Sequence, residues 1–214
     1  MLHGPSRSAL VVAVALQLLQ QASGINIVVY YGPQVLSDAG FSHRDAVLGT
    51  FVVGVAQLLA TAVLARLVDG VGRRPLALAG LAGMVAGLCA LATSAAPGVS
   101  SGSSARWIAV GSLLLFRVAF SLSLGPLPYI VTAEVFPTAT RSSGVAVAWV
   151  CNWLANFAIS LSFPSLLNAI TPTGVYAGYA AVSVLAAVYV AYGVPETSAG
   201  IQEQRQGRSP QKQP

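Results

Sequence analysis

The chain has 214 residues, of which 55% are hydrophobic and only 8% charged, and its mean hydropathy is +0.73. This composition is typical of an integral membrane protein and excludes an ordinary water-soluble domain. The net charge of +5 does not indicate a nucleic-acid partner, because the basic residues are spread over loop ends instead of forming one patch.

Apolar runs long enough to cross a lipid bilayer, about 20 residues each, recur along the whole chain. We predict an all-α, polytopic transmembrane bundle of six spans, with approximate bounds 9–31, 47–67, 76–96, 107–132, 144–166 and 175–194. The connections are short and leave no room for a soluble domain. Residues 1–195 would form this unit, and the polar residues 196–214 a disordered tail.

Basic residues predict the orientation, because Lys and Arg in short loops stay on the cytoplasmic side. Eight of the 11 precede the first span or follow the second, fourth and sixth: Arg7, Arg66, Arg73, Arg74, Arg141, Arg205, Arg208 and Lys212. The opposite loops hold only Arg44 and Arg106, while Arg117 lies within the fourth span. Both termini are therefore expected in the cytoplasm, with the bundle in the plasma membrane or an internal membrane.

A secretory signal peptide is an alternative interpretation of the first span, because a basic N-terminal region precedes an apolar run there. We favour a spanning helix, because apolar character continues to Tyr31 and the polar residues within it form a pattern. At about 100° per residue, one helix face carries Gln17, Gln20, Gln21 and Gly24. Such a stripe faces a bundle interior or a water-filled cavity, as a ligand site or as hydrogen bonds between helices.

Asn26 lies off that face of an ideal helix, so the helix is predicted to break near Gly24. Interrupted helices form substrate sites near the bilayer midplane of many transporters. Amides both donate and accept hydrogen bonds, which suits neutral polyhydroxyl ligands.

Two later spans carry similar signals. In the sequence GPLPY, Pro126 and Pro128 each remove a backbone donor and predict a second broken helix. In the fifth span, Asn152 and Asn156 share a face beside Trp153, a combination that suits a sugar, although helix packing is the alternative.

Other kinds of site find little support. Cys89 and Cys151 fall inside predicted spans, which disfavours a disulfide, and the two histidines lie in loops without further metal-ligating residues. An enzyme is disfavoured because no nucleophile is paired with a base and no phosphate motif is present. We expect no metal and no cofactor.

QQASGIN followed by YY resembles the seventh-helix signature of the sugar porter family, the glucose transporters of the major facilitator superfamily. The resemblance continues in the family's order through DGVGRR, GPLPY, AEVFPTATR, NWLAN and PET. Because that family builds its pore from twelve spans in two halves, the chain resembles its C-terminal six-helix half. The resemblance is strongest to the hexose facilitators and their polyol-carrying relatives.

The resemblance also implies roles for individual residues. It implies sugar binding by Gln20, Gln21, Asn26, Gln57, Tyr129, Asn152, Trp153 and Asn156. It implies gates formed by Tyr30, Tyr31, Phe120, Pro126 and Pro128. It implies a latch at the cytoplasmic helix ends, made when that side is closed, from Asp69, Arg73, Arg74, Glu134, Arg141 and Glu196.

The chain departs from the family's pattern at several positions. Tyr129 stands where many hexose facilitators have tryptophan, Ser121 where they have glutamate, and Gly70 where they usually have arginine. Arg117 lies where the family is usually uncharged, and no carboxylate lies in the middle of any span.

The expected function is alternating-access transport of a neutral hexose or polyol, with the sugar and the lipid bilayer as partners. The opposing N-terminal half would belong to a longer protein, to a separate chain, or to a second copy of this one. A non-transporting sugar sensor, or a regulatory subunit of a full-length porter, is the alternative, and a channel is a weaker one.

Overall fold

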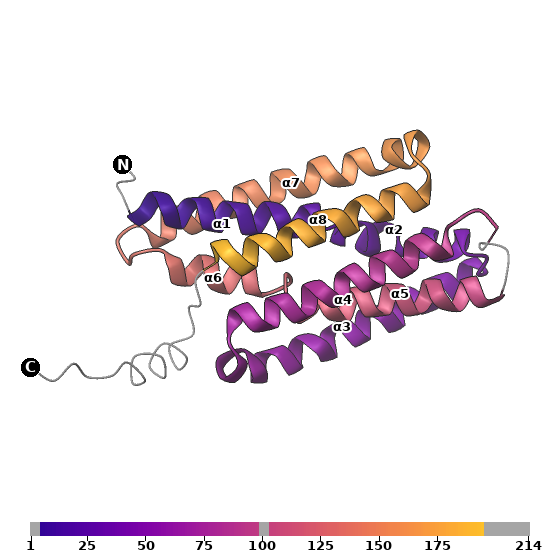
Figure 1. Ribbon diagram of the computed structural model, residues 1–214, viewed down its shortest axis with the longest axis horizontal. Coiled ribbons are helices and arrows are strands. Elements are labelled where there is room, and N and C mark those ends of the chain that lie inside the picture. The colour runs from indigo at the N-terminus through magenta and orange to yellow at the C-terminus, as the bar shows by residue number, and fades with distance from the viewer. Residues whose placement is uncertain (1–4, 99–102, 195–214) are drawn as a thin grey trace, which may run out of the picture.

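The computed structural model describes residues 5–98 and 103–194. Within these ranges the chain forms eight α-helices and no strand. The helices are α1 (Pro5–Ala22), α2 (Ile25–Asp38), α3 (His43–Val71), α4 (Arg73–Ser94), α5 (Ser103–Ser121), α6 (Leu127–Val135), α7 (Arg141–Ala169) and α8 (Pro172–Gly193). They run along the length of an elongated bundle (Figure 1).

Six segments of the described chain are long and apolar enough to cross a membrane, and α1 with α2 forms one of them. The predicted all-α bundle of six spans is therefore confirmed. The predicted fourth span is divided, because α5 ends at Ser121 and the short helix α6 begins at Leu127. The predicted tail, residues 196–214, lies outside the described residues.

The helices form two groups, with α3, α4 and α5 on one side and α1, α6 and α7 on the other (Figure 1). Within these groups α4 packs against α5 and α1 packs against α7, while α8 joins the groups by packing against α4. Small residues allow the α4–α5 approach, since a Cβ added at Gly80 would lie 2.6 Å from the Ala119 carbonyl oxygen.

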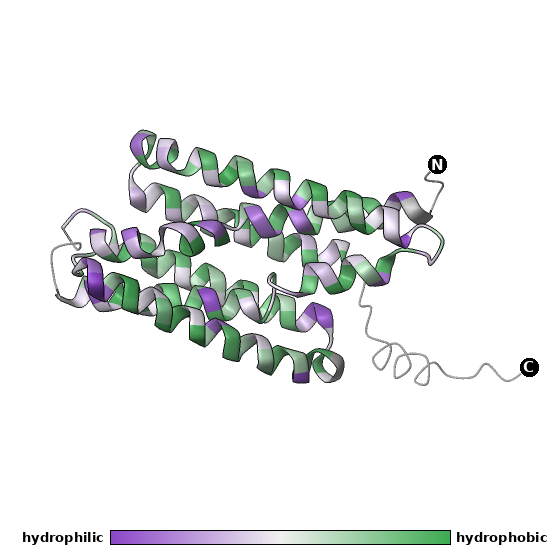
Figure 2. Cartoon of the chain, turned by 180° about the vertical axis from the view of Figure 1, so that it is seen from behind, coloured by the Kyte–Doolittle hydropathy of each residue, from purple (hydrophilic) through white to green (hydrophobic). Residues whose placement is uncertain are grey.

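Large apolar side chains are exposed mainly on α3 and α7, the two spans that the rest of the bundle covers least. They include Phe51, Leu58, Leu59, Leu154, Phe157 and Leu161. Figure 2 shows mostly hydrophobic helices with hydrophilic positions near their ends and at a few places halfway along them. A surface of this kind is stable against lipid or a protein partner, and not in water.

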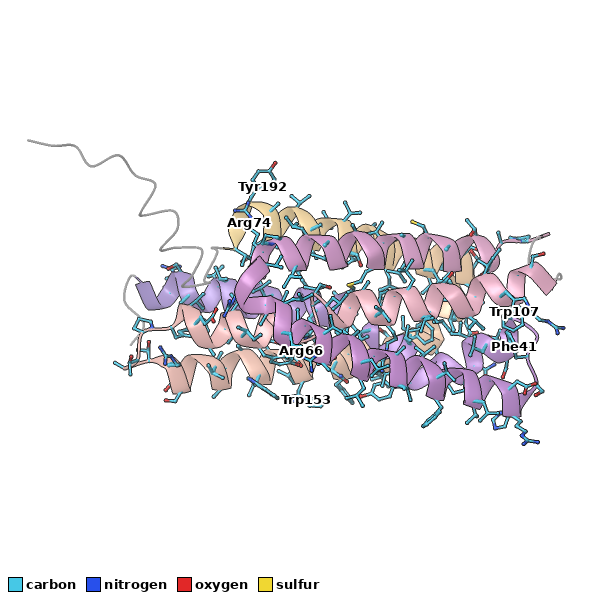
Figure 3. All side chains as sticks on the ribbon, turned by 90° about the horizontal axis from the view of Figure 1, so that it is seen from below. Phe41, Arg66, Arg74, Trp107, Trp153 and Tyr192 are labelled. Atoms are coloured by element: carbon cyan, nitrogen blue, oxygen red, sulfur yellow. The ribbon has the colours of Figure 1, made fainter. Side chains whose placement is uncertain are left out.

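Two connections between helices lie at the same end of the bundle, the one at Gly72 and the one preceding α7 (Figure 1). This end, which we call the basic end, carries Arg73, Arg74 and Arg141. At the opposite end Phe41 and Trp107 meet edge to face, with ring centroids 6.1 Å apart (Figure 3). The basic end corresponds to the side predicted to be cytoplasmic.

Candidate functional site

The first helix break lies at Gly24, as predicted. Gly24 has φ of 86° and separates α1 from α2. A Cβ at this position would also lie 2.8 Å from Cγ of the Tyr179 ring on α8. Both the left-handed backbone and the close approach of α8 therefore require glycine here.

The second break, also predicted, separates α5 from α6. After Ser121 the chain turns through residues 122–126, and the Gly125 N–H donates to the Phe120 carbonyl at 2.7 Å. Pro128 lies in the first turn of α6, where a helix has no use for its backbone donor. The prolines therefore start the second helix after the break and do not kink a continuous one.

Gln20 connects the two breaks. Its Nε2 donates to the carbonyl oxygens of Leu124 at 2.6 Å and Gly125 at 2.8 Å, both in the turn before α6. Lipid cannot satisfy such carbonyls, so irregular backbone within a span needs a donor from the protein or from a water-filled cavity. The Gln20 side chain thus stabilises the irregular backbone of a different span.

Asn152 joins the same cluster from α7 and is 2% exposed. Its Nδ2 donates to Oε1 of Gln20 and to Oε1 of Gln17, both at 2.7 Å. Its Oδ1 accepts from Gln21 Nε2 at 2.9 Å. Every polar atom of Asn152's amide is engaged, which holds α1 against α7.

The break at Gly24 brings Asn26 into this cluster, although an unbroken helix would point it elsewhere. Asn26 Nδ2 donates to Gln21 Oε1 at 2.6 Å, and its Oδ1 accepts from Asn156 Nδ2 at 3.1 Å. The Tyr129 hydroxyl donates to Gln20 Oε1 at 3.2 Å. Four helices therefore contribute polar groups to one cluster.

The cluster borders an open hollow of about 440 Å³, which we call the amide hollow. All eight residues predicted to bind sugar line it: Gln20, Gln21, Asn26, Gln57, Tyr129, Asn152, Trp153 and Asn156. Trp153 projects outward from α7 and is 58% exposed (Figure 3). A hollow of this size, mainly apolar with convergent polar groups, suits a small ligand.

The predicted gate residues divide among three places. Phe120 and Pro126 line the amide hollow, whereas Pro128 faces a different, apolar crevice beside α4 and α8. Tyr31 lies farther along α2, where its hydroxyl donates to the Ser160 carbonyl at 3.3 Å, and Tyr30 is exposed.

Two of the predicted latch residues form an ion pair at the basic end. Arg73 Nη2 lies 3.0 Å from Glu134 Oε1, which joins α4 to α6, and Arg74 follows Arg73 in α4. Arg141 donates from Nε and Nη2 to the Phe136 carbonyl, at 3.4 Å in each case. The Asp69 side chain and the whole of Glu196 lie outside the described part of the chain.

Further residues lie in or beside the amide hollow and its cluster but were not among the predicted binding residues. Thr61 and Arg117 line the amide hollow, Gln17 is fully buried in the cluster, and the Trp149 ring lies 5.0 Å from that of Tyr129. Thr61 follows Gln57 by four residues and Gln17 belongs to the predicted polar stripe, so helical spacing could have identified both.

The chain matches the family described as "Sugar (and other) transporter" over residues 2–204. It belongs to the sugar porter family of the major facilitator superfamily. This confirms the family that the motifs predict.

Two relatives of this sugar porter chain come from Escherichia coli (strain K12). The galactose-proton symporter is 35% identical over 192 residues, which is 89% of this chain and 41% of the symporter. The D-xylose-proton symporter is 38% identical over 197 residues, which is 88% of this chain and 38% of the symporter. The sugar porter chain thus spans about two fifths of the length of these relatives.

Solved structures agree with the fold. A crystal structure of D-xylose-proton symporter superposes with a TM-score of 0.76 at 34% identity, covering 88% of this sugar porter chain and 43% of that chain.

A plant relative, monosaccharide-sensing protein 1 of Arabidopsis thaliana, is 36% identical over 201 residues, which is 89% of this chain and 27% of that protein.

Proposed function

We propose that this chain binds a monosaccharide, a hexose or a related polyol, in the amide hollow and belongs to a transporter that moves it across a membrane by alternating access. The observation that carries the proposal is the convergence of all eight predicted binding residues on one hollow between two helix breaks. The family and the sugar-transporting relatives support the same conclusion.

The chemistry of the hollow suits a sugar. Each ring hydroxyl both donates and accepts, and the carboxamides offer both functions. The amides bond mainly to one another. A sugar would replace these bonds with bonds from its own hydroxyls, so that the buried amides are paired both with and without the sugar. Trp153 and Tyr129 add aromatic faces for the apolar side of the ring.

Alternating access would use the broken helices as hinges. The short helix α6 carries Tyr129, which contacts Gln20 in the site, and Glu134, which pairs with Arg73 at the basic end. Because both lie on one helix of 9 residues, a tilt of α6 would change the site and the ion pair together. The pair is thus suited to stabilise one of two states.

An opposing six-helix half would complete the binding site. The amide hollow is open, and α3 and α7, which supply part of its lining, carry the exposed apolar side chains. This half would come from the same polypeptide, a separate chain or a second copy, with both termini of the present chain in the cytoplasm.

Two matched substitutions test the proposal in the protein made from its complete coding sequence. Gln20→Ala and Asn26→Ala should each weaken binding of D-glucose, D-galactose or D-xylose about twofold to tenfold, the value of one or two hydrogen bonds. Asn168→Ala, an exposed position at the far end of α7, is the control. Unchanged sugar affinity in both test variants, with normal surface expression, would remove the amide hollow from the binding site.

A sugar sensor would bind without transporting, and the likeness to a monosaccharide-sensing protein makes this the second candidate. Uptake of labelled sugar into proteoliposomes separates the two functions. Uptake that saturates with sugar concentration, and that needs a higher concentration for half its maximal rate in Asn26→Ala, supports transport, whereas binding without uptake supports a sensor.

A further inference from the structure

Arg117 places a positive charge in the amide hollow. It lies on α5, four residues before the break that follows Ser121. Among the described residues that line the hollow it is the one charged side chain; the others are amides, hydroxyls, aromatic rings and apolar groups. The polar cluster described above does not use it.

The guanidinium group of Arg117 has no protein partner in the described part of the chain. Its Nε and Nη1 atoms are buried and make no hydrogen bond. The described carboxylates lie elsewhere: Asp38 and Asp45 at the end opposite the basic end, and Glu134 in its pair with Arg73. A charged side chain at the depth of a membrane span is costly unless a partner compensates it.

The hollow also borders the N-terminal end of α2, beside the C-terminal end of α1. Ile25 and Asn26, the first two residues of α2, line it. The first N–H groups of a helix have no intrahelical acceptor and carry a partial positive charge. Discontinuous helices in transporters point such ends at the anionic groups of their substrates.

We infer that the preferred substrate is a monosaccharide with one carboxylate, such as a hexuronate, whose carboxylate binds Arg117 while the amides bind its hydroxyls. The planar guanidinium matches a carboxylate with two parallel hydrogen bonds. The charge of one arginine neutralises that of one carboxylate. A sugar phosphate carries about −1.5 to −2 charges and would leave excess negative charge in the hollow. This inference rests on the proposed function and narrows its substrate.

The test measures binding to the protein made from its complete coding sequence, in lipid nanodiscs, by titration calorimetry. The ligands are D-glucuronate, D-glucose, and the methyl ester of glucuronate, which keeps the shape and removes the charge. We expect D-glucuronate to bind about tenfold more tightly than either neutral ligand, because charge-assisted hydrogen bonds are the stronger ones.

Arg117→Gln should abolish this preference, so that D-glucuronate and its methyl ester bind with equal affinity. Arg117→Lys should retain part of the preference, since lysine keeps the charge but lacks the planar guanidinium. Arg44→Gln, the same change at an exposed position at the opposite end of the bundle, should leave the preference intact. Thermal unfolding in detergent shows whether Arg117→Gln is folded; if it does not fold, the comparison of acid and ester in the unmodified protein decides.

Three results would overturn the inference. If D-glucose binds and D-glucuronate does not, a protein carboxylate from another segment pairs with Arg117, and the proposed sugar site stands without the acidic preference. If Arg117→Gln keeps the preference, another group binds the carboxylate. If neither the acid nor any neutral monosaccharide binds, the proposed function fails together with the inference.

Discussion

The Asn152 side chain on α7 donates to Oε1 of Gln20 on α1 at 2.7 Å. Through the same amide, Gln20 reaches the carbonyls of Leu124 and Gly125 in the turn between α5 and α6. Two residues thereby connect helices that are more than 100 positions apart in sequence. The site and the packing of three spans depend on the same hydrogen bonds.

Replacing Gly24 by alanine should destabilise the bundle and weaken sugar binding. A left-handed backbone costs about 1–2 kcal/mol for a residue with a Cβ, and the new methyl group would also meet the Tyr179 ring. The movement would displace Asn26 from the cluster. Thermal unfolding in detergent and sugar titration measure the two effects.

The control for this change is Gly178→Ala, next to Tyr179 on α8. A Cβ at Gly178 meets nothing within 4 Å, so the substitution should be neutral or stabilising by about 0.5–1 kcal/mol. Equal unfolding temperatures for the two variants would show that Gly24 does not need its special conformation.

Tyr129→Phe should weaken sugar binding about twofold to tenfold, because it removes the hydroxyl that donates to Gln20 and keeps the ring against Trp149. Tyr192→Phe makes the same chemical change on a side chain that is 89% exposed, and should have no effect. The dissociation constants of the two variants give the comparison. A larger loss in Tyr192→Phe would contradict the assignment of Tyr129 to the site.

Glu134→Gln should favour the state in which the basic end is open. The pair with Arg73 is partly exposed on the Glu134 side, so its value is about 1 kcal/mol or less, which allows roughly a fivefold shift in population. Distances between spin labels on α4 and α6 would report the shift. Arg66→Gln, an exposed charge on α3, is the control, and a double variant with Arg73→Gln should add little to Glu134→Gln.

The orientation can be tested with single cysteines in a background of Cys89→Ser and Cys151→Ser. A cysteine replacing Arg44 should react with a membrane-impermeant maleimide on intact cells, because it lies opposite the basic end. A cysteine replacing Ala139, an exposed residue before α7, should react only after permeabilisation. The reverse pattern would show that the basic end faces outward.

Much of the fold follows from the sequence, because a bilayer demands about 20 apolar residues for each span and the chain supplies six such runs. The break at Gly24 was also predictable, since Gln21 and Asn26 cannot share a face of an ideal helix. Polarity predicted the candidate binding residues in the same way: an amide in a span needs a partner, and the hollow and its cluster bring these amides together.

Other features could not be predicted, because periodicity identifies a helix face but not the helix that it meets. The contact of Gln20 with the turn at Leu124 depends on how α1 packs beside α6. Pro128 faces away from the hollow because α6 begins just before it, and the proline pattern does not determine that starting point within a turn. Arg117 was recognisable as unusual, but its place in the hollow required the structure.

The open side of the amide hollow links sugar binding to the association of α3 and α7 with a covering protein surface. Gln57 on α3 and Trp153 on α7 line the hollow, and these same helices carry the largest exposed apolar surface. A protein surface that covers α3 and α7 would therefore also enclose a sugar held between them. A ligand that binds only in the covered state stabilises that state by mass action. The sugar itself should therefore stabilise the association of the two halves.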